Sequence, residues 1–159
     1  MRYFLLDKVT SIEIGKVATG VKCVTLTDET LHDHFPDHPI LPGALITEGL
    51  AQLSGFLLEI SVNTESTLDL RRAVLVQIDK MKFHNHCGPG DRLEFRAIIE
   101  SLHEDAAQLS VEALSEGEKK AAGRLTFALL KIDSPKITAQ RVEVYKLWTR
   151  DLKHCPTLR

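Results

Sequence analysis

Short apolar runs alternate with polar residues near the start of the chain. Residues 8–27, KVTSIEIGKVATGVKCVTLT, hold β-branched runs that are broken at Gly15 and Gly20. β-branched residues favour strands, and glycine interrupts them. The pattern therefore predicts two strands, or one strand with a bulge, in the first part of the chain.

Residues 43–60, GALITEGLAQLSGFLLEI, carry apolar side chains on every side of a helical pattern. Good helix formers occur throughout this segment, and a helix that is apolar all round is a buried one. Pro42 suits a first helical turn, and Gly43 lets another group approach the backbone N–H groups there. The pattern predicts a buried helix that begins near residue 43.

The following segments favour an antiparallel sheet. Residues 61–70, SVNTESTLDL, are polar and aperiodic, which predicts a mobile loop. Four β-type runs come next, separated by short turn-forming segments, at residues 71–79, 91–102, 107–117 and 119–132. Their spacing favours a meander over βαβ units. One dry face is indicated by the alternation at Leu93, Phe95, Ala97 and Ile99. We expect a sheet wrapped around one central helix.

The C-terminal segment has a different period. Residues 138–154 place Val142, Tyr145, Trp148 and Leu152 at helical spacing, with Arg and Lys between them. This predicts an amphipathic helix docked on the sheet or on a neighbouring subunit. We expect residues 1–133 to form the main domain and residues 134–159 to form a helical extension of it.

Length, composition and charge narrow the class of protein. A chain of 159 residues with 43% hydrophobic and 26% charged residues is typical of one soluble globular domain. A net charge of -2 provides no global basic field for nucleic acid. No run is expected to span a membrane and no signal peptide is expected, so we expect a cytoplasmic protein. The odd, widely spaced Cys23, Cys87 and Cys155 predict free thiols.

A histidine cluster precedes the predicted helix. His32, His34, Asp37 and His38 are similar to the ligand run of metallo-β-lactamase-type hydrolases, but the spacing differs by one residue. Clustered His and Asp alone are a weak metal signal, and the expectation is that no metal is bound. His32 is interpreted as a polar turn residue, because exposed polar positions are its commoner place.

Glu48 is the charged residue of interest in the predicted helix. We expect it to be the one carboxylate inside an otherwise apolar helix, with Gln52 one turn later on the same face. A buried carboxylate needs a hydrogen-bonding neighbour or a raised pKa. Two interpretations stay open at this point: Glu48 acts together with His34, or it belongs to a structural network with Gln52.

A family resemblance bears on this choice. HFPDHPILPG followed by ITEGLAQ resembles the FabZ-type 3-hydroxyacyl-[acyl-carrier-protein] dehydratases, whose pattern is approximately GHFPxHPIxPG followed by a helix with EAMAQ. The similarity continues through RYFLLDKV, IGKVATGVKCVT and IDKMKFHNHCGPGDRLEF, and so covers roughly residues 2–100. It implies an α+β hot-dog fold, in which a curved antiparallel sheet wraps a long central helix, here with an extra C-terminal helix.

The resemblance also implies an activity, partners and site residues. It implies a homodimer or a trimer of dimers that acts on acyl carrier protein bearing a phosphopantetheine-linked acyl chain. His34 and Glu48 would face each other across the dimer interface, as base and acid for the removal of water. The Gly43 N–H at the helix start would bind the thioester carbonyl oxygen. This chemistry requires no metal and no other cofactor.

Further roles are expected for other residues. A substrate tunnel would be lined by Phe35, Pro42, Gln52 and Phe83. A basic rim for the acidic carrier protein would comprise Arg71, Arg72, Lys80 and Lys82, although evenly spread, solvated side chains are the commoner explanation.

Three departures from the family pattern leave other functions open. Asp33 stands where the family usually has glycine, and Gly49 stands where alanine is common, which would widen the tunnel or loosen the helix. The tail beyond Asp133 exceeds the family core. A specialised lipid or polyketide pathway is therefore considered beside fatty-acid synthesis. The alternatives are a catalytically silent hot-dog subunit that binds acyl chains or a partner dehydratase, and a hot-dog acyl thioesterase.

Overall fold

The structure, a computed structural model, describes residues 3–63 and 69–154. Six strands form one antiparallel sheet in the order β1-β2-β4-β5-β6-β3. The strands are β1 (Lys8–Glu13), β2 (Val17–Cys23), β3 (Arg71–Phe83), β4 (Arg92–Leu102), β5 (Ala106–Ser115) and β6 (Glu118–Lys131). The helices are η1 (Glu29–Leu31, a 3-10 turn), α1 (Gly43–Val62) and α2 (Pro135–Trp148).

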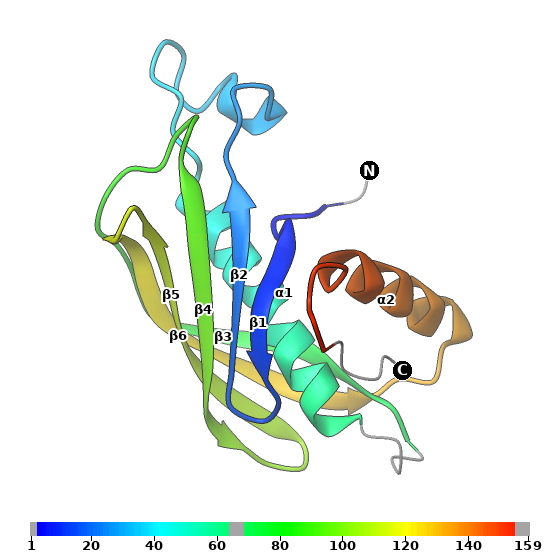
Figure 1. Cartoon of the computed structure of the whole chain (residues 1–159). Coiled ribbons are helices and arrows are strands. Elements are labelled where there is room, and N and C mark those ends of the chain that lie inside the picture. Colours follow the sequence, from blue (N-terminus) through cyan, green and yellow to red (C-terminus); the bar gives the residue numbers. More distant parts are fainter. Residues whose placement is uncertain (1–2, 64–68, 155–159) are drawn as a thin grey trace.

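The sheet curves around α1, which lies against its concave side (Figure 1). Side chains of α1 meet the inward-facing residues of β4, β5 and β6 in one core, which includes Leu50, Leu53, Leu57, Leu93, Phe95, Ala97, Leu109 and Leu125. Alternate residues of β4 point into this core because successive side chains of a strand face opposite sides. The predicted dry face and the hot-dog fold are confirmed.

Strand β3 is longer than predicted. Its pairing with β6 continues beyond residue 79 to Phe83, with a register shift between Asp79 and Lys82 and with Lys80 at a φ of 51°. A bulge inserts extra residues without ending a strand. The strand therefore continues past the predicted end at residue 79. Of the predicted mobile loop at 61–70, residues 64–68 lie outside the described residues.

Helix α2 begins at Pro135, earlier than predicted, because Ser134 caps it by accepting a hydrogen bond from the Ile137 N–H at 3.4 Å. The predicted apolar stripe is confirmed at its centre, where Tyr145 and Trp148 are buried. Both rings pack edge-to-face on Phe56 of α1, with centroids 5.0 and 6.4 Å away. α2 therefore packs its aromatic side chains on α1 and also contacts strand β1 of the sheet (Figure 1).

By length and composition alone, helix α1, Gly43–Val62, is long and apolar enough to cross a membrane. However, 67% of its apolar window is buried inside the protein, as is usual for the core helix of a soluble fold. Its apolar character is explained by the sheet that surrounds it.

Two glycines of α1 face opposite surroundings. A Cβ on Gly49 would lie 2.6 Å from the Leu5 carbonyl oxygen and 2.6 Å from the Phe95 ring, so Gly49 faces the N-terminal segment and β4. The expectation that it widens a tunnel is wrong, since it permits close packing of α1. A Cβ on Gly55 would meet its nearest neighbours, on Ala73 and Phe127, only at 4.0 Å.

These surroundings predict opposite effects of the same substitution. Gly49→Ala is expected to lower the free energy of unfolding by about 1–3 kcal/mol, because the helix must move from a backbone oxygen that cannot yield. Gly55→Ala is the matched control and should raise it by about 0.5–1 kcal/mol through helix propensity. Urea unfolding measures both. Equal effects of the two substitutions would contradict this packing.

The cysteines differ in environment. Cys23 is exposed and Cys87 is buried, and both are free thiols. Burial, and then the nearby charge of Asp91, raise the pKa of the Cys87 thiol to about 12. Cys155 lies outside the described residues.

Candidate active site

His34 is held in a tight loop before α1. Its Nδ1 lies 3.0 Å from the Ile40 carbonyl oxygen, and the Ile40 N–H donates back to the His34 carbonyl at 2.8 Å. A carbonyl oxygen can only accept, so Nδ1 carries the proton and neutral His34 keeps a basic Nε2. The ring of Phe35 stacks on His34 with centroids 4.6 Å apart, although 56% of Phe35 is exposed.

The start of α1 presents free backbone donors. The N–H groups of Leu45 and Ile46 donate to the Pro42 carbonyl at 2.9 and 3.2 Å. Among the hydrogen bonds of the described residues, none uses the N–H of Gly43 or Ala44. The Phe83 ring lies so close to Gly43 that a Cβ there would approach it to 2.7 Å. These donors, at the positive end of the helix dipole, suit a developing oxyanion.

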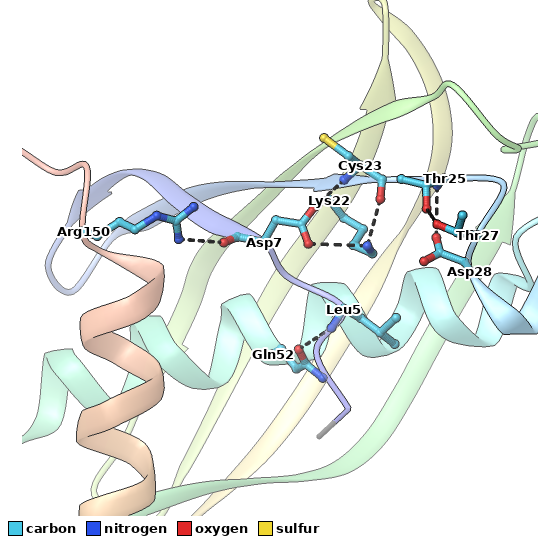
Figure 2. Close-up of polar contacts among 9 residues, drawn as sticks. All are labelled: Leu5, Asp7, Lys22, Cys23, Thr25, Thr27, Asp28, Gln52 and Arg150. Atoms are coloured by element: carbon cyan, nitrogen blue, oxygen red, sulfur yellow. Dashed lines mark hydrogen bonds and ion pairs between the residues drawn. The ribbon is translucent and has the colours of Figure 1, made fainter. Parts of the chain in front are cut away.

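Glu48 is half-buried and has the predicted partner. Gln52 Nε2 donates to Glu48 Oε1 at 3.0 Å. Gln52 also accepts from the Leu5 N–H and donates to the Tyr3 carbonyl, both at 3.0 Å. Figure 2 shows how the hydrogen bond from the Leu5 N–H to Gln52 links α1 to the N-terminal segment. The Leu5 N–H can only donate, so it fixes which end of the Gln52 amide faces Glu48.

Glu48 opens onto a pocket of about 160 Å³ between α1, β3, β6 and α2. Within one chain this pocket is not lined by His34, Phe35, Pro42, Gly43 or Phe83, whereas Gln52 does line it. Within one chain, the predicted site residues therefore form three separate groups. Glu48 and Gln52 lie at the pocket, His34 stacks on Phe35, and Gly43 lies against the Phe83 ring.

Glu59 was missed by the sequence analysis. It lies on the pocket face of α1, and only 2% of its side chain is exposed. The expectation that Glu48 is the one carboxylate inside this helix is therefore wrong. The signal was present in the sequence, because Glu59 follows Glu48 by eleven residues, close to three helical turns.

The buried Glu59 carboxylate is paired with Arg72 and accepts hydrogen bonds from Tyr145 and Ala73. Its Oε2 lies 3.2 Å from Arg72 Nη1 and accepts a hydrogen bond from the Tyr145 hydroxyl at 2.9 Å. Its Oε1 accepts from the Ala73 N–H at 3.2 Å. Burial, and then the charge of Glu59, raise the pKa of the Tyr145 phenol well above its usual range. Tyr145 therefore stays a neutral donor.

The predicted basic rim changes in composition. Arg72 is buried, and its Nη2 donates to Thr138 Oγ1 at 2.9 Å, so its proposed place on the rim is wrong. Arg71 is half-buried and pairs with Glu104 at 2.8 Å. Lys80 and Lys82 are exposed. Neighbouring strand residues face opposite sides, which explains why Arg71 and Arg72 differ.

The histidine loop does not gather metal ligands. Within residues 3–63 and 69–154, no group of three His, Cys, Asp or Glu side chains could hold a metal ion. Asp33 and His32 are exposed. Asp33 does not have a positive φ, whereas Asp37 does, at 63°. Asp in place of the usual glycine at residue 33 thus meets no left-handed backbone requirement.

Comparison with known proteins identifies the family. The family of FabA-like domains matches residues 1–122. The chain belongs to the FabA-like family. This FabA-like chain is 33% identical over 129 residues to the 3-hydroxyacyl-[acyl-carrier-protein] dehydratase FabZ of Clostridioides difficile, which covers 81% of this chain and 88% of that one. It is 36% identical over 127 residues to FabZ of Listeria monocytogenes, covering 80% and 85%. The resemblance found in the sequence is confirmed.

Solved structures share the fold of this FabA-like chain. AziG of S. sahachiroi superposes with a TM-score of 0.62 at 18% identity, covering 79% of this chain and 91% of that chain. The protein smu.793 from Streptococcus mutans, bound to acetyl CoA, gives a TM-score of 0.62 at 18% identity, covering 80% and 90%. Identities this low support the hot-dog fold alone. Helix α2 lies beyond the family match.

Proposed function

We propose that this chain is a hydro-lyase that converts (3R)-hydroxyacyl-acyl carrier protein thioesters into trans-2-enoyl thioesters. It would act in the cytoplasm, in fatty-acid synthesis or a related lipid or polyketide pathway. The proposal is supported by the segments HFPDHPILPG and ITEGLAQ, which hold His34 and Glu48 and resemble the family's motifs, in a chain that belongs to the FabA-like family.

The reaction needs one base and one acid. His34 Nε2 takes the C2 proton, and the electron pair of that C–H bond forms the C2=C3 double bond while the C3–O bond breaks. Glu48 protonates the departing hydroxyl, which leaves as water. When His34 has taken the proton, its Nδ1–H donates to the Ile40 carbonyl oxygen, and this hydrogen bond stabilises the positively charged ring. Proton exchange with solvent then restores both groups.

Charge that develops on the thioester oxygen also needs a donor. The Gly43 N–H at the start of α1 takes this role, helped by the helix dipole. Phe35, Pro42, Gln52 and Phe83 are the proposed tunnel residues. Phe35 and Phe83 are more than half exposed in one chain, which fits aromatic walls that a second subunit covers.

A homodimer would complete the site. β3 is an edge strand, and its exposed face carries Val74, Val76 and Ile78, which are 38, 60 and 50% exposed. An unpaired apolar edge is suited to pairing with a second copy. In such a dimer, His34 of one chain would serve the pocket of Glu48 in the other. A trimer of dimers is a further assembly of the same unit.

The partner is an acyl carrier protein that bears a phosphopantetheine-linked acyl chain. Lys80 and Lys82 are the exposed cations that remain from the predicted rim, and they are near Phe83 in the sequence. An acidic partner would approach this positive edge with a faster association rate.

The proposed reaction is tested by incubating the protein with (3R)-hydroxyacyl carrier protein and recording intact masses. Loss of one water from the acyl group is the expected result, without release of a free thiol. Thiol release would identify a thioesterase instead. Unchanged substrate at every chain length, with recovery only when a second hot-dog chain is added, would identify a silent subunit.

A further inference from the structure

The pocket beside Glu48 follows one face of α1. Its helical residues recur at spacings of three and four, which places them in one strip. They are Glu48, Ala51, Gln52, Gly55, Phe56 and Glu59. At 1.5 Å per residue, this strip rises about 16 Å along the helix. The pocket therefore leads from the proposed acid, Glu48, to the buried Glu59.

Helix α2 forms the far wall of this pocket. Tyr145 and Arg141 line it beside Glu59, with the Tyr145 hydroxyl 2.9 Å and Arg141 Nε 3.8 Å from carboxylate oxygens of Glu59. Tyr145 is held in place by Phe56 and Trp148, whose ring centroids are 5.0 and 5.9 Å away. Since α2 lies beyond residue 122, where the family match ends, this wall is a feature of the extension.

The chemistry of the wall differs from that of the pocket's middle. Gly55, Ala73, Leu75 and Phe127 supply apolar parts of the lining, beside the polar side chains of Glu48, Gln52, Glu59, Arg141 and Tyr145. An apolar chain end that reached Glu59 would separate its carboxylate from Arg141 without offering a replacement contact, which is unfavourable. The pocket volume is about 160 Å³. With about 30 Å³ for a group the size of water or a methylene, that is room for about five groups.

Arg141 also borders a second space. A groove of about 380 Å³ between the N-terminal segment and α2 is lined by Tyr3, Phe4, Ile137 and Val144, and Arg141 lines it too. The Arg141 side chain therefore stands between the pocket at Glu59 and a largely apolar groove. Its removal would join the two spaces.

We propose that α2 determines acyl-chain length: the pocket along α1 binds the acyl tail, and Arg141 and Tyr145 stop it at Glu59. The preferred acyl groups then have about four to eight carbons, given the reacting carbons outside the pocket and about five groups within it. This inference rests on the proposed function for the identity of the ligand. The length limit itself rests on the pocket.

Two substitutions change the pocket in opposite directions. Arg141→Ala should extend it into the groove, so that twelve-carbon chains gain about tenfold in affinity. Gly55→Ala places a methyl group in its middle, within 4.0 Å of Ala73 and Phe127, and should cost eight-carbon chains about tenfold, the scale of discrimination for one methylene-sized change. Lys146→Ala, at an exposed position of α2, is the control and should change neither.

The experiment measures binding and turnover separately. Saturated acyl-pantetheine thioesters of four, eight and twelve carbons lack the 3-hydroxyl group, so calorimetry reports their binding without reaction. Dehydration of 3-hydroxyacyl carrier protein of the same lengths is followed in parallel. Three results together support the inference. The unmodified protein binds the twelve-carbon chain more weakly than the eight-carbon chain, Arg141→Ala strengthens binding of the twelve-carbon chain, and Gly55→Ala weakens binding of the eight-carbon chain.

The two proposals fail in different ways. A length profile that shifts as expected, with no dehydration, would overturn the proposed function and leave the length limit supported. Dehydration with a profile that neither variant alters would overturn the length limit and leave the function intact. An absence of acyl binding at every length would also overturn the length limit.

Discussion

Replacing His34 by alanine is expected to lower kcat/KM for dehydration by about 10²–10⁴-fold, the usual contribution of a general base. The half-buried ring contributes its Nδ1 contact to the Ile40 carbonyl and its stack on Phe35, both within the loop, so the fold should remain. Glu48→Gln should cause a loss of similar size, because the amide has no acidic proton to give to the leaving hydroxyl. Its oxygen can still accept the hydrogen bond from Gln52.

His32→Ala provides the matched control. His32 is exposed and lies two residues from His34 in the same loop, so its loss should leave the rate unchanged. Dehydration is measured with 3-hydroxyacyl carrier protein, and circular dichroism verifies folding. An active His34→Ala protein would contradict the assigned base.

Mixing the two inactive variants tests whether the site is shared between subunits. If His34 of one chain serves Glu48 of the other, unfolding and refolding a mixture of His34→Ala and Glu48→Gln should restore about a quarter of the wild-type rate. Half of the random dimers are mixed, and each contains one intact site of two. No recovery in verified mixed dimers would place both groups of a working site in the same chain.

Glu59→Ala is expected to lower the free energy of unfolding by about 3–5 kcal/mol, the usual cost of leaving one charge of a buried ion pair without its partner. Both Glu59 and Arg72 are 2% exposed, so the orphaned guanidinium could not reach water without local opening. The Tyr145 hydroxyl would lose its acceptor as well. Chemical denaturation measures the change.

Two further variants separate the charge effect from loss of packing. Glu112→Ala removes a carboxylate that pairs with Lys119 at 3.1 Å near the surface, and should cost about 0–1 kcal/mol. Glu59→Leu combined with Arg72→Met removes both buried charges, and should be less destabilising than the sum of the single variants. Additive losses would contradict a direct interaction between Glu59 and Arg72.

The sequence predicted the elements whose signals are local. Residues 43–60 are apolar on all sides, which indicated a core helix, and the alternation from Leu93 to Ile99 indicated the buried face of β4. The bulge near Lys80 was missed, since it depends on how β3 follows β6. The start of α2 differs from the prediction because the Ser134 side chain caps the helix at Pro135, before its periodic apolar residues begin.

The sequence by itself determined the family, the helix that carries Glu48, and the fourteen-residue spacing from His34 to Glu48, because motif spacing and helical periodicity are properties of consecutive residues. Tertiary structure decided the rest. Glu59 meets Tyr145 across 86 residues, and Gln52 meets Leu5 across 47. Contacts over such separations arise only when the sheet, α1 and α2 pack together, since burial then makes each polar group require a partner. This packing buries Arg72, which was predicted at the surface, as the counterion of Glu59. It also places Glu59, Arg141 and Tyr145 in the lining of the pocket beside Glu48.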